Sequence, residues 1–184
     1  MMETKTSLKF SSTINTTNFK VGDAKQTNEL KYSFLNDCNR KPENIFTLAK
    51  AFLSISKMTN KKLQKLCYYA KAWYLALYGR NLISENFQAW VHGAVQPALY
   101  QQYKKYGYQE IPQVTETSDI PEEFLSFAKE IYDSYGDLTG DELEQINHQE
   151  DPWIKARGTC KPWEICNNEI SESDMEEFYR KMMV

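Results

Sequence analysis

Histidine, cysteine and carboxylate side chains are the residues of this chain that could bind a metal or carry out catalysis. The chain has two histidines, His92 and His148. His148 is followed by Glu150 and Asp151, and a histidine beside two carboxylates has the donor atoms of a metal site. The same order of residues just before a helix is more typical of capping and packing, so we predict no metal site. The sequence contains no HExxH motif and no Cys-x-x-Cys pair.

The cysteines do not form a pattern that predicts chemistry. Cys160 and Cys166 are separated by five residues, whereas paired zinc ligands are usually separated by two to four. Cys67 lies in an apolar stripe, where a free cysteine behaves as a small hydrophobic residue. We therefore expect Cys38, Cys67, Cys160 and Cys166 to be reduced thiols, as is usual in the cytoplasm.

Motifs for phosphate binding and nucleophilic catalysis are absent from the sequence. There is no GxGxxG, no GxxxxGK[ST] and no GxSxG. A Cys–His nucleophilic pair stays open as an alternative, but nothing distinguishes one cysteine from the others. We predict no catalytic, metal-binding or cofactor-binding residues, and a protein that is not an enzyme.

The charges are distributed unevenly along the chain. Residues 43–110 contain nine Lys and Arg but three Asp and Glu, whereas residues 111–184 contain six and eighteen. Such a gradient indicates either a charged partner surface or attraction between two halves of one domain. Tyr and Trp interleave with the basic segment Lys57–Lys71, a composition that also suits nucleic acid. Because the net charge is −3, we consider direct nucleic-acid binding the less favoured alternative.

Helical periodicity dominates the chain from residue 42 onward. Apolar residues recur at spacings of three and four in seven segments, near 43–53, 61–78, 97–106, 124–135, 139–146, 152–157 and 173–182. Very short β elements are expected near 86–95 and 111–114. We therefore predict a mostly α protein, with one compact multi-helix domain over 42–184. Residues 1–41 are rich in Thr, Asn, Ser and Lys without a period, which predicts a flexible arm.

Helix-terminating residues mark several boundaries. Pro42 suits the first turn of a helix, and Thr139 with Glu142 has the spacing of a capping box. Three helices end in Tyr–Gly, which predicts a left-handed glycine at Gly79, Gly107 and Gly136. The chain shows neither a secretory signal nor an apolar run long enough for a bilayer, so we expect a cytoplasmic protein without a membrane partner.

The helix predicted from Lys61 to Gly79 is unusually aromatic. Trp73 and Tyr74 have the phase of its apolar stripe and are expected in the core. Tyr68, Leu75 and Tyr78 lie off that stripe. They either pack against neighbouring helices of the same chain or face a partner.

Three blocks of sequence form a recognisable set of motifs. They are Lys61–Ala70 with Trp73-Tyr74-Leu75 and Tyr78-Gly79, Phe87–Trp90 with His92–Val95, Pro97 and Tyr100, and Leu143–His148 with Pro152-Trp153 and Ala156-Arg157. Together they resemble the Panacea domain, the SocA-like family of bacterial and phage antitoxins. The resemblance extends over residues 43–183. Where the family turn usually has Tyr-Gly-Pro-Val, this chain has His92-Gly93-Ala94-Val95, and we expect the missing proline to relax the turn without abolishing it, because Gly93 remains.

This resemblance implies a compact helical domain that neutralises a co-encoded toxin by binding it. In one branch of the family the protein delivers its toxin to a protease, which leaves a protease adaptor as an alternative. The resemblance offers no catalytic residues. The residues matching the family signature, which we expect in the core, are Leu63, Leu66, Tyr69, Trp73, Tyr74, Pro97, Tyr100 and Trp153. The candidate partner-binding residues are Tyr68, Leu75, Tyr78, Trp90, His92, Gly93 and Val95.

Overall fold

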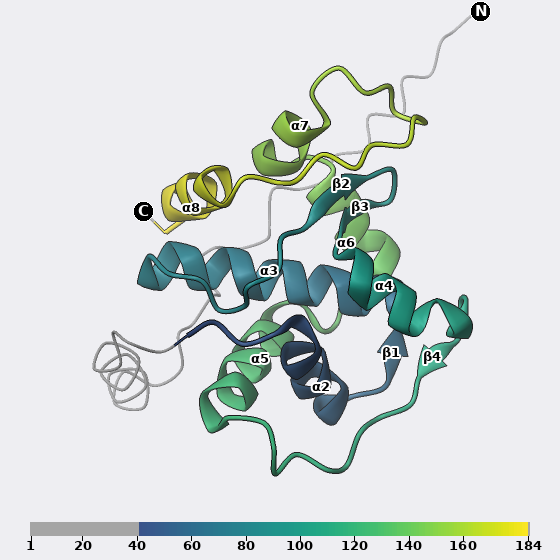
Figure 1. Cartoon of the computed structure of the whole chain (residues 1–184), viewed down its shortest axis with the longest axis vertical. Coiled ribbons are helices and arrows are strands. Elements are labelled where there is room, and N and C mark those ends of the chain that lie inside the picture. The colour runs from purple at the N-terminus through teal and green to yellow at the C-terminus, as the bar shows by residue number, and fades with distance from the viewer. Residues whose placement is uncertain (1–40, 184) are drawn as a thin grey trace, which may run out of the picture.

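Six helices lie around one central helix in the computed structural model, which describes residues 41–183 (Figure 1). The predicted flexible arm therefore lies, except for Lys41, outside the described residues. The helices are α2 (Ile45–Ile55), α3 (Asn60–Tyr78), α4 (Pro97–Tyr103), α5 (Glu122–Tyr135), α6 (Gly140–Asn147), α7 (Asp151–Arg157) and α8 (Glu172–Lys181). A short 3-10 turn, Lys104–Tyr106, extends α4. The prediction of a mostly helical protein is confirmed.

The central element is α3, with 19 residues the longest helix of the described part. The Thr59 side chain caps its first turn by accepting a hydrogen bond from the Lys62 N–H, and Gly79 closes it in the left-handed conformation, with φ at 64°. Helices α6 and α8 pack on one side of α3, and α2 and α5 on the other (Figure 1). As a result almost every side chain of α3 is buried.

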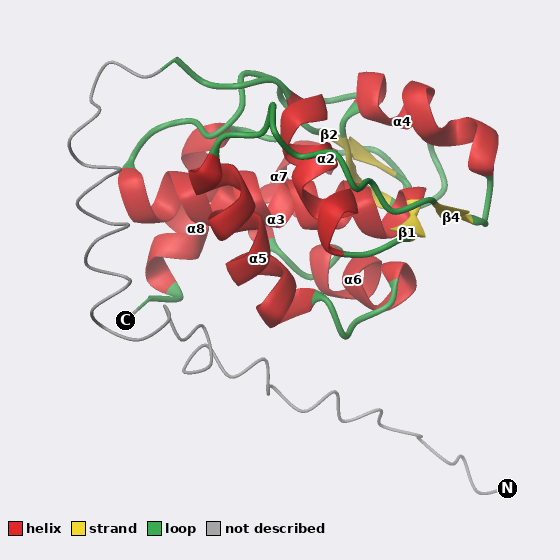
Figure 2. Ribbon diagram, turned by 90° about the horizontal axis from the view of Figure 1, so that it is seen from below, coloured by secondary structure: helices red, strands yellow, loops and turns green. Residues whose placement is uncertain are grey.

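Two small antiparallel strand pairs lie at the same end of the molecule as α4 (Figures 1 and 2). Strand β2 (Gln88–Trp90) pairs with β3 (Gly93–Val95) as a hairpin, in agreement with the predicted element near 86–95. Strand β1 (Met58–Thr59) pairs with β4 (Glu110–Ile111). The second predicted element is thus shorter and begins earlier than residues 111–114.

Helix ends confirm some predictions and correct others. The capping box of Thr139 and Glu142 is present. Helix α2 begins at Ile45 and is capped by Asn44, so Pro42 does not lie in its first turn. Gly107 has a positive φ of 56°, but its ψ of −119° lies outside the left-handed helical region, so the prediction of a left-handed glycine is wrong there and holds only for Gly79. Gly136 was wrongly expected to be left-handed: its φ is −69°, and glycine suits this position because a Cβ would lie 2.4 Å from the Tyr132 carbonyl oxygen.

Aromatic rings from three helices form the centre of the core. The rings of Tyr69 on α3 and Tyr135 on α5 stack at 4.4 Å, and the Trp73 indole N–H donates to the Tyr135 hydroxyl at 2.8 Å. Tyr179 of α8 meets Trp73 edge to face. The core prediction is confirmed for Leu63, Leu66, Tyr69, Trp73 and Tyr74. None of the described helices has the length and apolarity needed to cross a membrane.

Candidate protein-binding surface

Two of the candidate partner-binding residues belong to the core instead. Tyr68 is fully buried, and its ring contacts Tyr69 and Phe87 edge to face. Leu75 is 4% exposed. The expectation that these two side chains face a partner is therefore wrong, because neighbouring elements cover α3 on every side. For both, the intramolecular alternative is correct.

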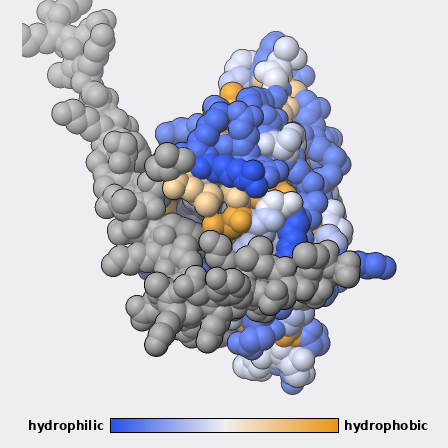
Figure 3. Space-filling view, turned by 90° about the vertical axis from the view of Figure 1, so that its left-hand side faces the viewer, coloured by the Kyte–Doolittle hydropathy of each residue, from blue (hydrophilic) through white to orange (hydrophobic). Residues whose placement is uncertain are grey.

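Tyr78, near the end of α3, is half-buried. Its ring lies 4.7 Å from that of Tyr74 and 6.4 Å from that of Phe127 on α5. Burial raises the pKa of the Tyr78 hydroxyl to about 12. On the face that carries this end of the molecule, a small apolar patch lies among hydrophilic atoms (Figure 3). Tyr78 thus contributes mainly to the packing of α3 on α5.

The hairpin residues Trp90, His92 and Val95 instead line a cleft of about 580 Å³. The first turns of α3 and α6 form one side of this cleft, and α4 with the turn that follows it forms the other. These three hairpin residues were all predicted as candidate partner-binding residues. The prediction did not include the opposite wall, where Tyr108 is 99% exposed and Tyr100 is 37% exposed.

A buried lysine holds the hairpin in place. Lys65 is 1% exposed, and its ammonium group donates to the carbonyl oxygens of His92 and, at 3.0 Å, Ala94. Burial lowers the pKa of Lys65 to about 7. Gly93 passes so close that a Cβ there would lie 2.5 Å from the Lys65 nitrogen. Gly93 is therefore buried and shapes the turn, but it is not a contact residue itself.

Amide side chains hold the remainder of the hairpin. The Ala94 N–H donates to Asn147 Oδ1 at 2.6 Å, and the Gln96 N–H donates to Gln64 Oε1 at 2.8 Å. Asn147 in turn donates to the carboxyl of Glu150 at 3.0 Å. These amides were not predicted, since the only signal for them in the sequence is a polar residue in an otherwise apolar stripe. Their hydrogen bonds hold the turn in this chain, which has Ala94 where the family has proline.

Charged and aromatic groups form the rim of the cleft. The His92 side chain is 73% exposed, with Nδ1 3.1 Å from Glu144 Oε1, and Lys61 lies 2.7 Å from both Glu144 and Asp141. Burial raises the pKa of Glu144, but the hydrogen bonds from Lys61 and His92 outweigh it and hold that pKa below its ordinary value. A partner would meet cations and carboxylates side by side here.

The other signature residues lie partly outside the core. Tyr100 was expected in the core but is exposed, with its ring 5.2 Å from that of Trp90. Pro97 begins α4 and is half-buried. Trp153 is half-buried as well: its indole N–H donates to the Trp90 carbonyl at 3.1 Å. These residues surround the hairpin and do not form a second apolar centre.

The residues first examined for metal binding are used structurally. The His148 ring stacks on Trp153 at 4.2 Å, and burial lowers its pKa. Within residues 41–183 no group of three or more His, Cys, Asp and Glu side chains is placed to hold a metal ion. The three cysteines in this range are free thiols.

The structure is therefore a helical domain whose hairpin, held by buried hydrogen bonds, borders an open cleft. Residues 63–154, half of the chain, match the family model described as antitoxin SocA-like, Panacea domain. The chain belongs to the SocA-like Panacea antitoxin family. This match is shorter than the resemblance described above, but it includes the hairpin and most of the cleft. No curated protein and no solved structure matches the chain.

Proposed function

We propose that this protein neutralises a co-encoded toxin by binding it directly at the cleft beside the β2–β3 hairpin. The observation that supports this proposal is the cleft itself, which lies almost wholly in the part of the chain that matches the antitoxin family. Its exposed aromatic rings, Tyr100 and Tyr108, are of the kind that dominates the binding energy of protein interfaces. The protein acts by contact and not as an enzyme.

The rigid backbone around the cleft favours tight binding. Lys65, Asn147 and Gln64 fix the hairpin before any partner arrives. A surface that is already ordered loses less conformational entropy on binding. The eighteen acidic residues of 111–184 suit a toxin with a basic face, because complementary fields accelerate association.

Direct nucleic-acid binding receives less support from the structure. Among the lysines of the segment Lys57–Lys71, Lys65 and Lys71 are buried. Lys71 donates to the Glu85 carbonyl and pairs with Glu172 at 2.6 Å. Phosphate contacts need exposed cations, and these two lysines stabilise the fold instead.

The decisive experiment is to co-express the chain with the product of the neighbouring reading frame. We expect that product to arrest growth alone and to be harmless together with this protein. A Tyr100→Ala, Tyr108→Ala double variant should bind a catalytically inactive form of the toxin at least tenfold more weakly, as measured by isothermal titration calorimetry. Phe46→Ala is the matched control, since Phe46 is 41% exposed on α2, outside the cleft.

Three outcomes would contradict the proposal. Unchanged affinity of the Tyr100→Ala, Tyr108→Ala variant would remove the cleft from the interface. A toxin that disappears from the cell only while a protease is active would support the protease adaptor, and a salt-dependent gel shift would support the nucleic-acid alternative. We expect the complex to form in the cytoplasm, so cell fractionation of both proteins completes the test.

A further inference from the structure

The loop between α7 and α8 exposes two large apolar side chains. Trp163 is 75% exposed and Ile165 is 82% exposed. With one residue between them, they lie outside the residues that match the family model. Large apolar side chains exposed to water two positions apart in one loop are a typical feature of a binding surface. The segment from Gly158 to Asn168 is called the Trp163 loop below.

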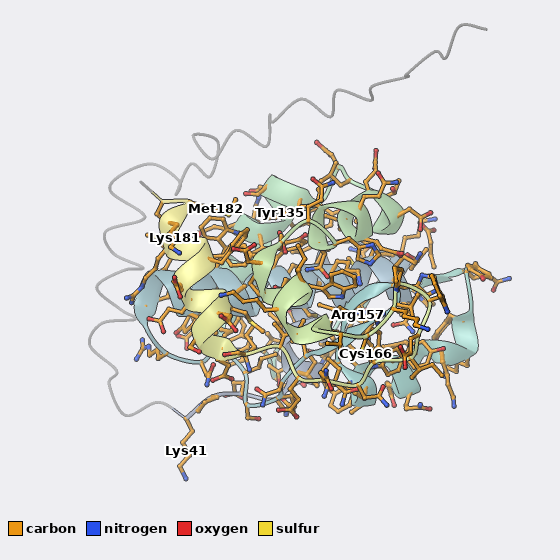
Figure 4. All side chains as sticks on the ribbon, turned by 90° about the horizontal axis from the view of Figure 1, so that it is seen from above. Lys41, Tyr135, Arg157, Cys166, Lys181 and Met182 are labelled. Atoms are coloured by element: carbon orange, nitrogen blue, oxygen red, sulfur yellow. The ribbon has the colours of Figure 1, made fainter. Side chains whose placement is uncertain are left out.

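A buried arginine holds this loop from beneath. Arg157 is 4% exposed, and its guanidinium donates to the carbonyl oxygens of Glu164 at 3.0 Å and of Lys161. The same group donates to the Ala89 carbonyl on β2 at 3.3 Å. Figure 4 shows Arg157 at the base of the loop that carries Cys166. The arginine therefore joins the loop to the hairpin.

Further contacts close the loop at both ends. The sulfur atoms of Cys160 and Cys166 lie 2.8 Å apart. Where the chain returns, the Ala89 N–H donates to the Asn168 carbonyl at 2.9 Å, so the loop ends against β2. The backbone is thus held while Trp163 and Ile165 remain in water.

The charged side chains of the Trp163 loop, Lys161 and Glu164, contact other groups of the same loop. The Glu164 carboxylate accepts from the Lys161 N–H at 3.1 Å, and the Lys161 ammonium lies 6.0 Å from the centre of the Trp163 ring. The loop therefore presents the apolar surfaces of Trp163 and Ile165 beside charged groups that already have contacts within it. A partner that matches it needs an apolar pocket and not a charged patch.

We propose that the Trp163 loop is a preformed docking element that inserts Trp163 and Ile165 into an apolar pocket of the toxin. This proposal depends on the proposed function. Strand β2 supports it, because its Trp90 lines the cleft while its neighbour Ala89 is bonded to Arg157 and Asn168. The loop and the cleft thus lie along one strand and can contact the same partner.

The test compares variants of the full-length chain for binding to the inactive toxin by biolayer interferometry, with a reductant present to keep the cysteines as thiols. We expect Trp163→Ala and Ile165→Ser each to weaken binding at least tenfold, without changing the circular dichroism melting curve. The weakening should be the same at low and high salt, since it comes from apolar burial. Phe46→Ala replaces an exposed aromatic residue of α2, far in sequence from the Trp163 loop. This variant should bind the toxin as the wild type does.

Failure of this inference differs from failure of the proposed function. If the wild type binds the toxin and the Tyr100→Ala, Tyr108→Ala variant binds it more weakly, but the Trp163→Ala, Ile165→Ser double variant binds normally, the docking loop is wrong and the antitoxin function stands. If the wild type itself does not bind the toxin, both are wrong. A wild-type dimer that Trp163→Ala converts to a monomer, with toxin binding unchanged, would assign the loop to a second copy of this chain and overturn the proposal.

Discussion

At the scale of single residues, two buried ionisable side chains support the hairpin, Lys65 directly and Glu150 through Asn147. Burial shifts their pKa values in opposite directions. Lys65 and Glu150 are both almost fully buried. Burial lowers the pKa of Lys65 to about 7 and raises that of Glu150 to about 7. Each group therefore favours its neutral form in the folded protein, and each makes stability depend on pH in its own range.

Glu150 should make the protein less stable as the pH rises from about 5 to 7. In that range the unfolded chain has released the proton of this carboxyl while the folded protein still holds it, so raising the pH favours unfolding. We expect the free energy of unfolding to fall by up to about 1 kcal/mol per pH unit. Urea unfolding at several pH values measures this slope. Glu150→Gln should flatten it, whereas the exposed Glu169→Gln should not; an unchanged slope in Glu150→Gln would show that another group is responsible.

Gly93 offers a second prediction at this scale. Its φ of +88° disfavours any side chain, and a Cβ would collide with Lys65 and with Asn147. Gly107 has a φ of +56° but open space around it. Alanine should cost about 1–3 kcal/mol at both positions for the backbone, and distinctly more at Gly93 because of the collision. Thermal unfolding of Gly93→Ala and Gly107→Ala compares them, and equal losses would mean that the turn can move away from Lys65.

At the scale of elements, the hairpin and the Trp163 loop depend on contacts that are distant in sequence. Trp153 and Arg157 of α7 donate to the carbonyls of Trp90 and Ala89 on β2, respectively. A two-stranded hairpin is only marginally stable alone, so these side chains keep it in position. Helix α7 is therefore the support of both proposed contact surfaces.

Replacing Arg157 by lysine should loosen the loop and leave the rest folded. Lysine keeps the charge but has a single ammonium group in place of the planar fork that reaches several carbonyls. We expect chymotrypsin to cleave after Trp163 several times faster in Arg157→Lys than in the wild type, with a nearly unchanged far-ultraviolet circular dichroism spectrum. Arg180→Lys on α8 is the control. Equal cleavage rates in all three proteins would mean that the arginine does not order the loop.

At the scale of the whole molecule, aromatic side chains have two separate roles, one in the core and one at the surface. Those of α3 build the core, where Tyr68 and Tyr69 are fully buried. Those of the cleft and the Trp163 loop remain exposed. Tyr68→Ala should therefore cost about 3–5 kcal/mol of stability, as for other large buried aromatics, whereas Tyr108→Ala should cost less than about 0.5 kcal/mol. Chemical denaturation measures both, and a small loss for Tyr68→Ala would argue against the position of α3 at the centre.

Local pattern was enough to predict the helices. The stripe that begins at Ile45, the capping box at Thr139 and the alternation near Phe87 each depend on neighbours within a few residues, and the structure confirms them. The motifs of α3 and the hairpin also identified the family, because they are runs of adjacent residues. Trp90, His92 and Val95 were predicted as candidate partner-binding residues from the same run of adjacent residues, and the structure places them along the cleft.

Only the tertiary structure decided which aromatic residues meet water. The periodicity of one helix distinguishes a single apolar face, but α3 is surrounded by four helices and buries Tyr68 and Leu75 as well. Conversely, Tyr100 has the spacing of a core residue but is exposed, since no element within residues 41–183 buries it. The clamp of Arg157 on β2 joins residues 68 positions apart in the chain. No local pattern encodes such a contact, because burial is a property of how elements pack together and not of any one of them.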